Sequence, residues 1–327
     1  MYCWIKKISV LLWIGLFPLS GLAAATDGVW PGQAPISYVV PYPPGGSTDI
    51  LARNIGRLLS EKLGASVVVE NRAGATGTIG SGYVARAKPD GHTVLHTTTG
   101  PQSIVSHFRK LPYDPIKSLE PVIMVGTFPH VLLVNSESPY HSVSDLTAAA
   151  KNKPNSLTFG SAGAGTILHM QGELLKLKTG ITATHIPYKG DTPVLQAVMS
   201  GEVTFAFVPI VSALAQLEGG KLRAIAVTSE KRMPNLKDVP TMAEQGVADF
   251  VVVQWQGVYV PAGTPKEVVT SLNRDINTIL NNSKLRELAS GLKIDLIGGS
   301  PKQLADKQLA DYDLWGRVIR DANIRID

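Results

Sequence analysis

Cysteine is almost absent from this chain, since its 327 residues include only Cys3. Beyond that position the sequence can form no disulfide and supplies no thiol nucleophile or thiolate metal ligand. Small secreted domains often depend on disulfides, but a chain of about 300 residues buries enough apolar surface to be stable without them. The composition therefore excludes cysteine–histidine catalysis and a disulfide-stapled fold.

Long apolar runs are also scarce. The run Ile8–Phe17 follows two lysines and precedes the small residues Gly21–Ala25. A charged start, a short apolar segment and an A-x-A-like end are typical of a secretory signal peptide, and the run is too short to span a membrane. Cys3 lies ahead of the run, where it cannot be the lipid anchor of a lipoprotein. We therefore expect residues 1–25 to be a cleavable signal peptide and the remainder to be a soluble periplasmic protein.

Charge of either sign is modest. The chain carries 31 Lys+Arg and 26 Asp+Glu, a formal net charge of +5. Residues 1–25 hold two of the lysines and no acid, so their removal leaves 29 minus 26, or +3. Nucleic-acid binding requires a concentrated basic face, and no such run occurs. The balance predicts no nucleic-acid partner and is compatible with an anionic small molecule.

Motifs of enzymatic chemistry are missing as well. The glycines at 74–80 and 160–165 lack the spacing of a dinucleotide-binding loop, and no Gly-Lys-Ser/Thr phosphate loop occurs. Ser161 stands in Gly-Ser-Ala-Gly, which is not the nucleophile motif of α/β-hydrolases. His92 and His96 flank a predicted strand and do not form a helical metal pair. We expect no catalytic residue, no metal and no cofactor.

The sequence does contain a regular alternation of short β-branched runs with amphipathic segments. Ser37–Val40 and Ser66–Glu70, for example, are each followed by a segment with helical periodicity. Strands separated by helices imply right-handed βαβ units. The alternation therefore predicts an α/β fold with two mostly parallel sheets flanked by helices.

The length of the chain favours two domains. Two apolar segments, Phe128–Val134 and Val251–Tyr259, are candidates for strands that cross between them. The segments enclose a run of the usual size of one α/β domain. We predict a first domain of residues 26–130 and 254–327 and a second domain of residues 131–253. A two-strand hinge of this kind allows the domains to close on a ligand in the cleft that it lines.

Three predicted junctions between a strand and a helix share one composition. They are Pro41–Thr48 (PYPPGGST), Ala73–Gly80 (AGATGTIG) and Gly160–Thr166 (GSAGAGT). Each places glycines and hydroxyl residues at the carboxyl end of a strand, where open α/β sheets bind ligands. Backbone N–H groups at a helix N-terminus suit a carboxylate or phosphate oxygen. The alternative is that each junction is only a well-formed connection.

In the first junction, Ser47 or Thr48 is the expected N-cap, and Asp49 is placed where the helix dipole favours a carboxylate. His169 lies one turn into the helix after the third junction. It is close enough to reach a ligand, but a single histidine there is more simply explained as a helix-face or partly buried residue.

A further candidate follows the predicted strand Ala183–Pro187. Tyr188 offers a ring face and a hydroxyl, and Lys189 offers a positive charge, to a ligand bound between the domains. The alternative is a solvated loop with a packed tyrosine.

Several segments, in order and with matching spacing, resemble the Bug family of extracytoplasmic solute-binding receptors of tripartite tricarboxylate transporters. They include YPPGGSTDILAR, VVVENRAGATGTIGSGYVARAKPDGHTVL, LTFGSAGAGTILHMQGELLK, HIPYKG and LKDVPTMAEQG. The resemblance extends from Pro35 to Thr270. It implies a type II-like periplasmic-binding-protein fold, a small carboxylate ligand, no enzymatic activity, and the membrane permease subunits of such a transporter as partners.

The resemblance also implies a division of roles between the loops. Those matching Tyr42–Thr48 and Ala73–Ile79 would hold a carboxylate, partly through ordered waters, and the loop matching Ser161–Thr166 would close over it. One departure from the family pattern is Val208, where many relatives have aspartate. A ligand ammonium group buried without a counter-charge is costly. We therefore predict a di- or tricarboxylate or an aromatic acid, with Val208 as an apolar wall, and not an amino acid.

The predicted ligand-binding residues combine the three junctions with the candidates above. They are Tyr42, Gly45, Gly46, Ser47, Thr76, Gly77, Thr78, Ser161, Ala162, Thr166, Tyr188, Lys189 and Val208. The predicted protein is a monomer that captures its ligand by domain closure. Two alternatives stay open: a ligand-presenting partner of a membrane sensor kinase, and a periplasmic hydrolase that uses Ser161 and His169.

Overall fold

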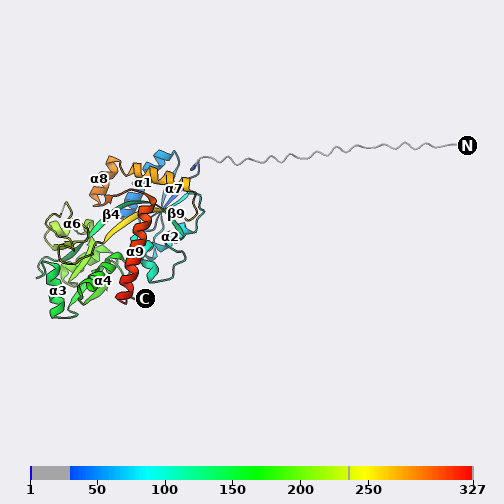
Figure 1. Cartoon of the computed structure of the whole chain (residues 1–327). Coiled ribbons are helices and arrows are strands. Elements are labelled where there is room, and N and C mark those ends of the chain that lie inside the picture. The colour runs from blue at the N-terminus through cyan, green and yellow to red at the C-terminus, as the bar shows by residue number, and fades with distance from the viewer. Residues whose placement is uncertain (2–29, 235, 326–327) are drawn as a thin grey trace.

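The computed structural model describes residue 1, residues 30–234 and residues 236–325. Apart from Met1, the predicted signal peptide therefore lies outside the described residues. Figure 1 shows helices arranged around a long central sheet. Within the described part of the chain, no helix combines the length and the apolar character needed to cross a membrane.

Strands and helices alternate over most of the chain. The strands are β1 Ile36–Val40, β2 Val67–Asn71, β3 Thr93–Thr98, β4 Leu119–Asn135, β5 Leu157–Ser161, β6 Ala183–Pro187, β7 Phe205–Pro209, β8 Leu222–Val227, β9 Val253–Pro261 and β10 Asp295–Leu296. The α-helices are α1 Ser47–Leu63, α2 Thr78–Ala85, α3 Val143–Asn152, α4 Ile167–Thr179, α5 Asp191–Ser200, α6 Ile210–Glu218, α7 Lys266–Ile279, α8 Ser283–Gly291 and α9 Pro301–Asp321. Short turns of other helix types are η1 Ala75–Gly77, η2 Gly100–Ile104 and η3 Val105–His107.

Strand β4 belongs to two sets of strands. The order is β2-β1-β3-β9-β4 in the first set and β4-β7-β5-β6 in the second, and β8 and β10 also pair with β4. Parallel ladders join β1 to β2 and β3, and β5 to β6 and β7. The described pairings of β4 and β9 are antiparallel. The α/β class is confirmed, but the expectation of mostly parallel sheets is wrong around β4 and β9, because the crossing strands run in opposite directions.

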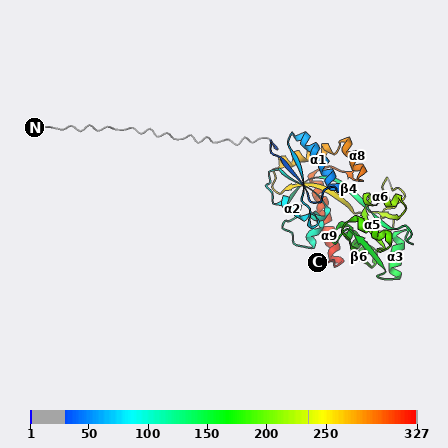
Figure 2. The same ribbon diagram turned by 180° about the vertical axis from the view of Figure 1, so that it is seen from behind.

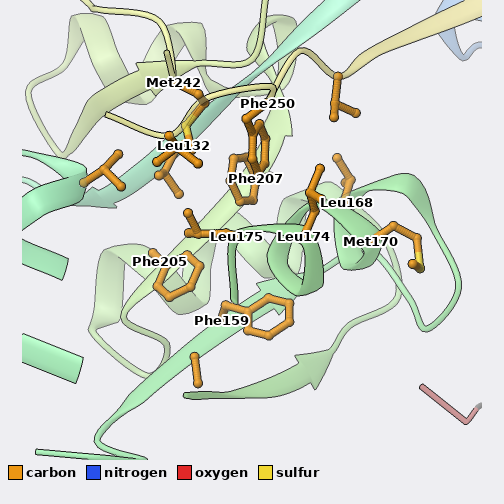
Figure 3. Close-up of a cluster of buried hydrophobic side chains, with 14 of the residues drawn as sticks. Leu132, Phe159, Leu168, Met170, Leu174, Leu175, Phe205, Phe207, Met242 and Phe250 are labelled. Atoms are coloured by element: carbon orange, nitrogen blue, oxygen red, sulfur yellow. The ribbon is translucent and has the colours of Figure 1, made fainter. Parts of the chain in front are cut away.

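Four apolar clusters of the described residues contain residues of β4, two toward each of its ends. We call residues 30–130 and 254–325 the first lobe and residues 131–253 the second lobe; the division into domains stays a prediction. Figure 2 shows α1 and α8 on the first lobe and α3, α5 and α6 on the second. The first-lobe core includes Leu51 and Ile55 of α1, packed with Val258 of β9. The second-lobe core contains several aromatic rings, which Figure 3 shows.

Helix α9 contacts both lobes. Near its start, Leu304 packs with Trp255 and Tyr259 of β9. Near its end, Trp315 and Val318 lie in the second-lobe core, and Figure 1 shows α9 extending from beside β9 to beside α4. The last helix therefore adds a third connection between the lobes, besides the two long strands.

Helix N-termini are capped in two different ways. Ser300 forms a capping box with Gln303, and Pro301 follows it at the first helical position. At α1 the prediction of Ser47 or Thr48 is wrong, because the N-cap is Gly46 and no side chain caps it. Instead, the carboxylate of Asp49, in the first turn of the helix, accepts a hydrogen bond from the N–H of Gly45, the residue before the N-cap.

The position of α4 depends on Gly172. A methyl group on this residue would lie 2.1 Å from Cε2 of Phe159, on β5. The ring of Phe159 is itself fully buried and stacks on Phe205. Because residue 172 has no side chain, α4 packs directly on β5 and the loop between them is held close to the core.

We expect Gly172→Ala to lower the free energy of unfolding by about 1–3 kcal/mol, since the buried ring has no room to move aside. Gly291→Ala is the matched control, because a methyl group there meets nothing within 4 Å and Ala favours a helix. Urea unfolding of both variants measures the difference. A Gly172→Ala midpoint equal to that of the unmodified chain would contradict this description of the packing.

Candidate functional site

The loops singled out by the sequence lie at strand ends that point toward one another. Thr98, at the end of β3, pairs with Gln256 of β9, and Gln256 also pairs with Gly126 of β4. The end of β3 is therefore level with Gly126. The end of β7 at Pro209 pairs with His130, four residues further along β4. Because β3 runs in the direction of β4 and β7 runs against it, the carboxyl ends of the parallel strands of each lobe face the other lobe.

In the first lobe, three segments meet at Tyr42. The Tyr42 hydroxyl lies 2.6 Å from Oγ1 of Thr98, and its backbone oxygen accepts a hydrogen bond from the side chain of Asn71. A methyl group on Gly77 would lie 3.2 Å from the same hydroxyl. Burial raises the pKa of Tyr42 to about 12, so the phenol stays protonated at neutral pH. The structure thus brings the first two predicted loops together with the end of β3.

Asp49 organises the first loop from inside the protein. Its Oδ2 accepts hydrogen bonds from the Gly45 N–H at 2.9 Å and from Nε of Arg53 at 3.0 Å, and its Oδ1 accepts one from Asn71 at 2.8 Å. Burial alone would raise the pKa of Asp49, but these donors lower it below its usual value. The N–H of Gly45, a predicted ligand donor, is therefore used within the protein. The first N–H groups of α1 itself have no acceptor within the helix.

The second loop has a strained backbone. Ala75, Thr76 and Gly77 all have positive φ angles, of 46°, 57° and 86°. Left-handed conformations cost non-glycine residues about 1–2 kcal/mol each, and such strain is often found at functional sites. Thr78 is buried and its hydroxyl donates to the backbone oxygen of Ala75 at 2.8 Å, so the hydroxyl is not free to hold a ligand. Thr76 is half-buried beside Gly100.

In the second lobe, the hydroxyls of the third loop are also bonded internally. Oγ of Ser161 lies 3.0 Å from the backbone oxygen of Gly163 and 2.7 Å from Nε2 of His185. Thr166 is the N-cap of α4, and its hydroxyl donates to the same oxygen of Gly163. Ala162 is half-buried against the second-lobe core. The N–H groups of Gly163, Gly165 and Thr166 are bonded internally as well, so the donors left for a ligand here are the first N–H groups of α4.

Two histidines support this loop. The rings of His169 and His185 stack with centroids 3.7 Å apart, and Nδ1 of His169 accepts a hydrogen bond from the N–H of Gly165 at 3.1 Å. Burial and the neighbouring His169 lower the pKa of His185 to about 3. Nε2 of His169 lies 3.7 Å from Oε1 of Glu173, which also pairs with Lys176.

The arrangement around Ser161 does not resemble a hydrolytic site. Ser161 contacts His185 and not the predicted His169. Among the hydrogen bonds of the described residues, none joins His185 to a carboxylate, and a histidine with so low a pKa is a weak base. In the same part of the chain, no group of three His, Cys, Asp or Glu residues could hold a metal ion.

Of the remaining predicted residues, Tyr188 is bonded within the second lobe, Lys189 is exposed and Val208 is buried. The N–H of Tyr188 donates to the backbone oxygen of Ser161, and its hydroxyl donates to Glu202 at 2.7 Å. Burial and Glu202 raise the pKa of Tyr188 to about 12. Val208 is fully buried in a cluster with Val131 and other apolar residues, so its side chain presents no surface to a ligand in this structure.

The sequence analysis missed the end of β3 and the segment that follows it. Thr97 and Gln102 are fully buried, and Oγ1 of Thr97 and both amide atoms of Gln102 have no hydrogen-bond partner among the described residues. Buried polar groups without a partner are costly, and they often bind ordered water or ligand. The signal was three successive threonines before Gly100, at the carboxyl end of a third parallel strand. His185 was missed because its pairing with Ser161 joins residues on different strands.

A separate groove lies beside the crossing strands. It has a volume of about 760 Å³ and is lined by Thr127 and Pro129 of β4, by 229–234 after β8, and by residues of α8 and the segment after it, including Arg286 and Lys293. None of the ligand-binding residues predicted from the sequence lines it. The groove and the facing loops are therefore distinct candidate sites.

Comparison with known proteins identifies the family. Residues 51–324 match the family described as "Tripartite tricarboxylate transporter family receptor" (TctC). The chain is similar to "Protein BugT" of Bordetella pertussis, with 34% identity over 96% of this chain and 97% of BugT. It is also similar to the solved structure "R. palustris Rpa4515 with adipate", with 36% identity, a TM-score of 0.79, and coverage of 91% of this chain and 99% of that one.

A second solved relative is "MatC (Rpa3494) from Rhodopseudomonas palustris with bound malate". It is 31% identical, with a TM-score of 0.75, and the match covers 89% of this chain and all of that one (100%). The matched family is one of solute-binding receptors and not of enzymes. The chain belongs to the TctC, or Bug, family of periplasmic solute-binding receptors.

Proposed function

We propose that this protein captures a small carboxylate that carries no amino group, and delivers it to the permease of a tripartite tricarboxylate transporter. The observation that carries the proposal is the placement of α1 and α4. Each follows a glycine-rich loop at the carboxyl end of a strand, and these ends face each other along β4. Relatives with adipate and malate bound support an acid of this class.

The ligand is held chiefly by backbone N–H groups and by water. The hydroxyls of Thr78, Ser161 and Thr166 already bond to backbone oxygens, so they shape the loops more than they donate to a ligand. Helix N-termini favour anions through their free N–H groups and their dipole. Water-mediated contacts are nearly as favourable as direct ones. The free amide of Gln102 adds a donor and an acceptor for ligand or water.

The charges around the loops argue against an amino-acid ligand. Asp49 is bonded to Arg53, and Glu173 is paired with Lys176, so neither carboxylate is free to neutralise a ligand ammonium group. An uncompensated buried ammonium group is strongly unfavourable.

Transport follows from the same arrangement. Rotation of the two lobes about β4 and β9 closes the loops of both lobes on the ligand. The closed form of a monomer then docks on the permease. A sensor kinase as the receiving partner is the alternative, and co-purification with candidate membrane partners separates the two. We place the protein in the periplasm after removal of residues 1–25.

A thermal-shift series tests the ligand class. At 100 times its Kd, a ligand stabilises the folded state by about 2.7 kcal/mol, which raises the melting temperature by about 4–8 °C. We expect such shifts with adipate, malate, citrate or phthalate, and none with glutamate or aspartate at equal concentration. A larger shift with glutamate than with every acid lacking an amino group would overturn the proposed selectivity.

A pair of glycine variants tests the place of binding. In Gly77→Ala the added methyl group meets Tyr42 and Pro101 at 3.2 Å, whereas in Gly64→Ala it meets nothing within 4 Å. Both residues have positive φ, so both variants lose about 1–2 kcal/mol of stability. Calorimetry should show binding weakened about tenfold or more, roughly 1.4 kcal/mol, in Gly77→Ala alone. Equal affinities in both variants would place the ligand elsewhere.

A further inference from the structure

The loops that precede α1 in the first lobe and α4 in the second lobe are held by the same local hydrogen-bond arrangement. In α1 the N-cap is Gly46, and Asp49, three residues on, accepts a hydrogen bond from the N–H of Gly45 at 2.9 Å. In α4 the N-cap is Thr166, and His169, three residues on, accepts one from the N–H of Gly165 at 3.1 Å. Gly45 and Gly165 have similar φ angles, of 89° and 75°.

This hydrogen-bond arrangement is a variant of the capping box. In the usual form, a Glu or Gln three residues after the N-cap accepts a hydrogen bond from the N-cap N–H. Here the acceptor reaches one residue further back, to the glycine before the cap. A positive φ at that glycine turns its N–H toward the helix. Removal of the acceptor leaves the glycine N–H unpaired and releases the loop at the point where it enters the helix; at Gly165 this N–H is buried, whereas Gly45 is exposed.

The two acceptors differ in charge. Asp49 is a carboxylate whose charge is balanced by Arg53 at 3.0 Å. His169 accepts at Nδ1, so this nitrogen carries no proton and the remaining proton is on Nε2, on the side of Glu173. Its ring stacks on His185, whose low pKa keeps that ring neutral, and Lys176 pairs with Glu173. The first turn of α4 therefore holds its loop without adding a negative charge.

We propose that His169 is the positioning residue of the second lobe. Its uncharged imidazole fixes Gly165, and with it the 161–166 loop, in the shape that receives a carboxylate, while leaving the positive end of the α4 dipole unopposed. A carboxylate at position 169 would hold the loop equally well but would repel the ligand. The inference rests on the proposed carboxylate-binding function of this loop.

Three substitutions separate the parts of this proposal. His169→Asn places an uncharged oxygen where Nδ1 now lies, since both atoms are attached to Cγ. His169→Gln places its oxygen one bond further out, at the position of Nε2, where it does not reach Gly165. His169→Asp keeps an acceptor at the correct place and adds a negative charge. Circular dichroism and urea unfolding without ligand check that each variant is folded.

The measurements are calorimetric titration with adipate and with malate at pH 8, and hydrogen exchange of the Gly165 amide without ligand. We expect His169→Asn to bind within about threefold of the unmodified protein, and His169→Gln to bind about tenfold more weakly. His169→Asp should bind at least about tenfold more weakly, although its Gly165 amide stays protected. The Gly165 amide should lose protection in His169→Gln only.

Each contrary result has a distinct meaning. If the Gln variant binds as tightly as the Asn variant, the Gly165 contact does not position the loop for binding. Equal affinity of the Asp and Asn variants would overturn the requirement for an uncharged acceptor. If neither acid binds to the unmodified protein, the proposed function fails for these acids. Hydrogen exchange of the Gly165 amide still tests the positioning role in that case. Loss of protection in the His169→Gln variant alone supports the role, and equal protection in all variants contradicts it.

Discussion

The antiparallel pairing of β4 with β9 is the interaction on which the arrangement of the molecule depends. Strand β4 extends for 17 residues, from Leu119 to Asn135, and supplies a strand to the core of each lobe. Its direction sets the direction of every strand that pairs with it. Because of this, the carboxyl ends of β1–β3 and of β5–β7 are brought face to face, and the helices α1 and α4 begin on either side of the same space.

The side chains around that space mostly serve the loops themselves. Asp49 fixes the first loop, and the hydroxyl of Thr166 and the imidazole of His169 fix the third. This leaves backbone N–H groups as the donors that are free to meet an anion. Backbone donors recognise a carboxylate without regard to the rest of the molecule that carries it. A family with this frame can therefore accept different acids when residues elsewhere change, as the adipate-bound and malate-bound relatives illustrate.

The order of strands and helices could be predicted from the sequence because the hydrophobic pattern and the turn residues agree along most of the chain. The cap at Ser300 is an example in which a local pattern is sufficient. The full length of β4 could not be predicted, because Pro121 and Pro129 argue against a central strand. The structure accommodates Pro121 next to a shift in the strand register.

The three loops at the strand ends could be predicted, but their side-chain contacts could not. The pairing of Ser161 with His185 and the burial of Val208 depend on how β5, β6 and β7 align, and the sequence does not contain that register. The Asp49 carboxylate was expected at a helix N-terminus for its charge. That it accepts a hydrogen bond from Gly45, in place of a cap by Ser47 or Thr48, follows from the loop geometry alone.

The most direct test of this account is a crystal structure of the protein with a bound dicarboxylate, either adipate or malate. The account predicts one carboxylate within hydrogen-bond distance, or one water molecule, of the first N–H groups of α1 and α4, between the 41–48 and 161–166 loops. A dicarboxylate bound instead in the groove beside β4, against Arg286 and Lys293, would contradict it.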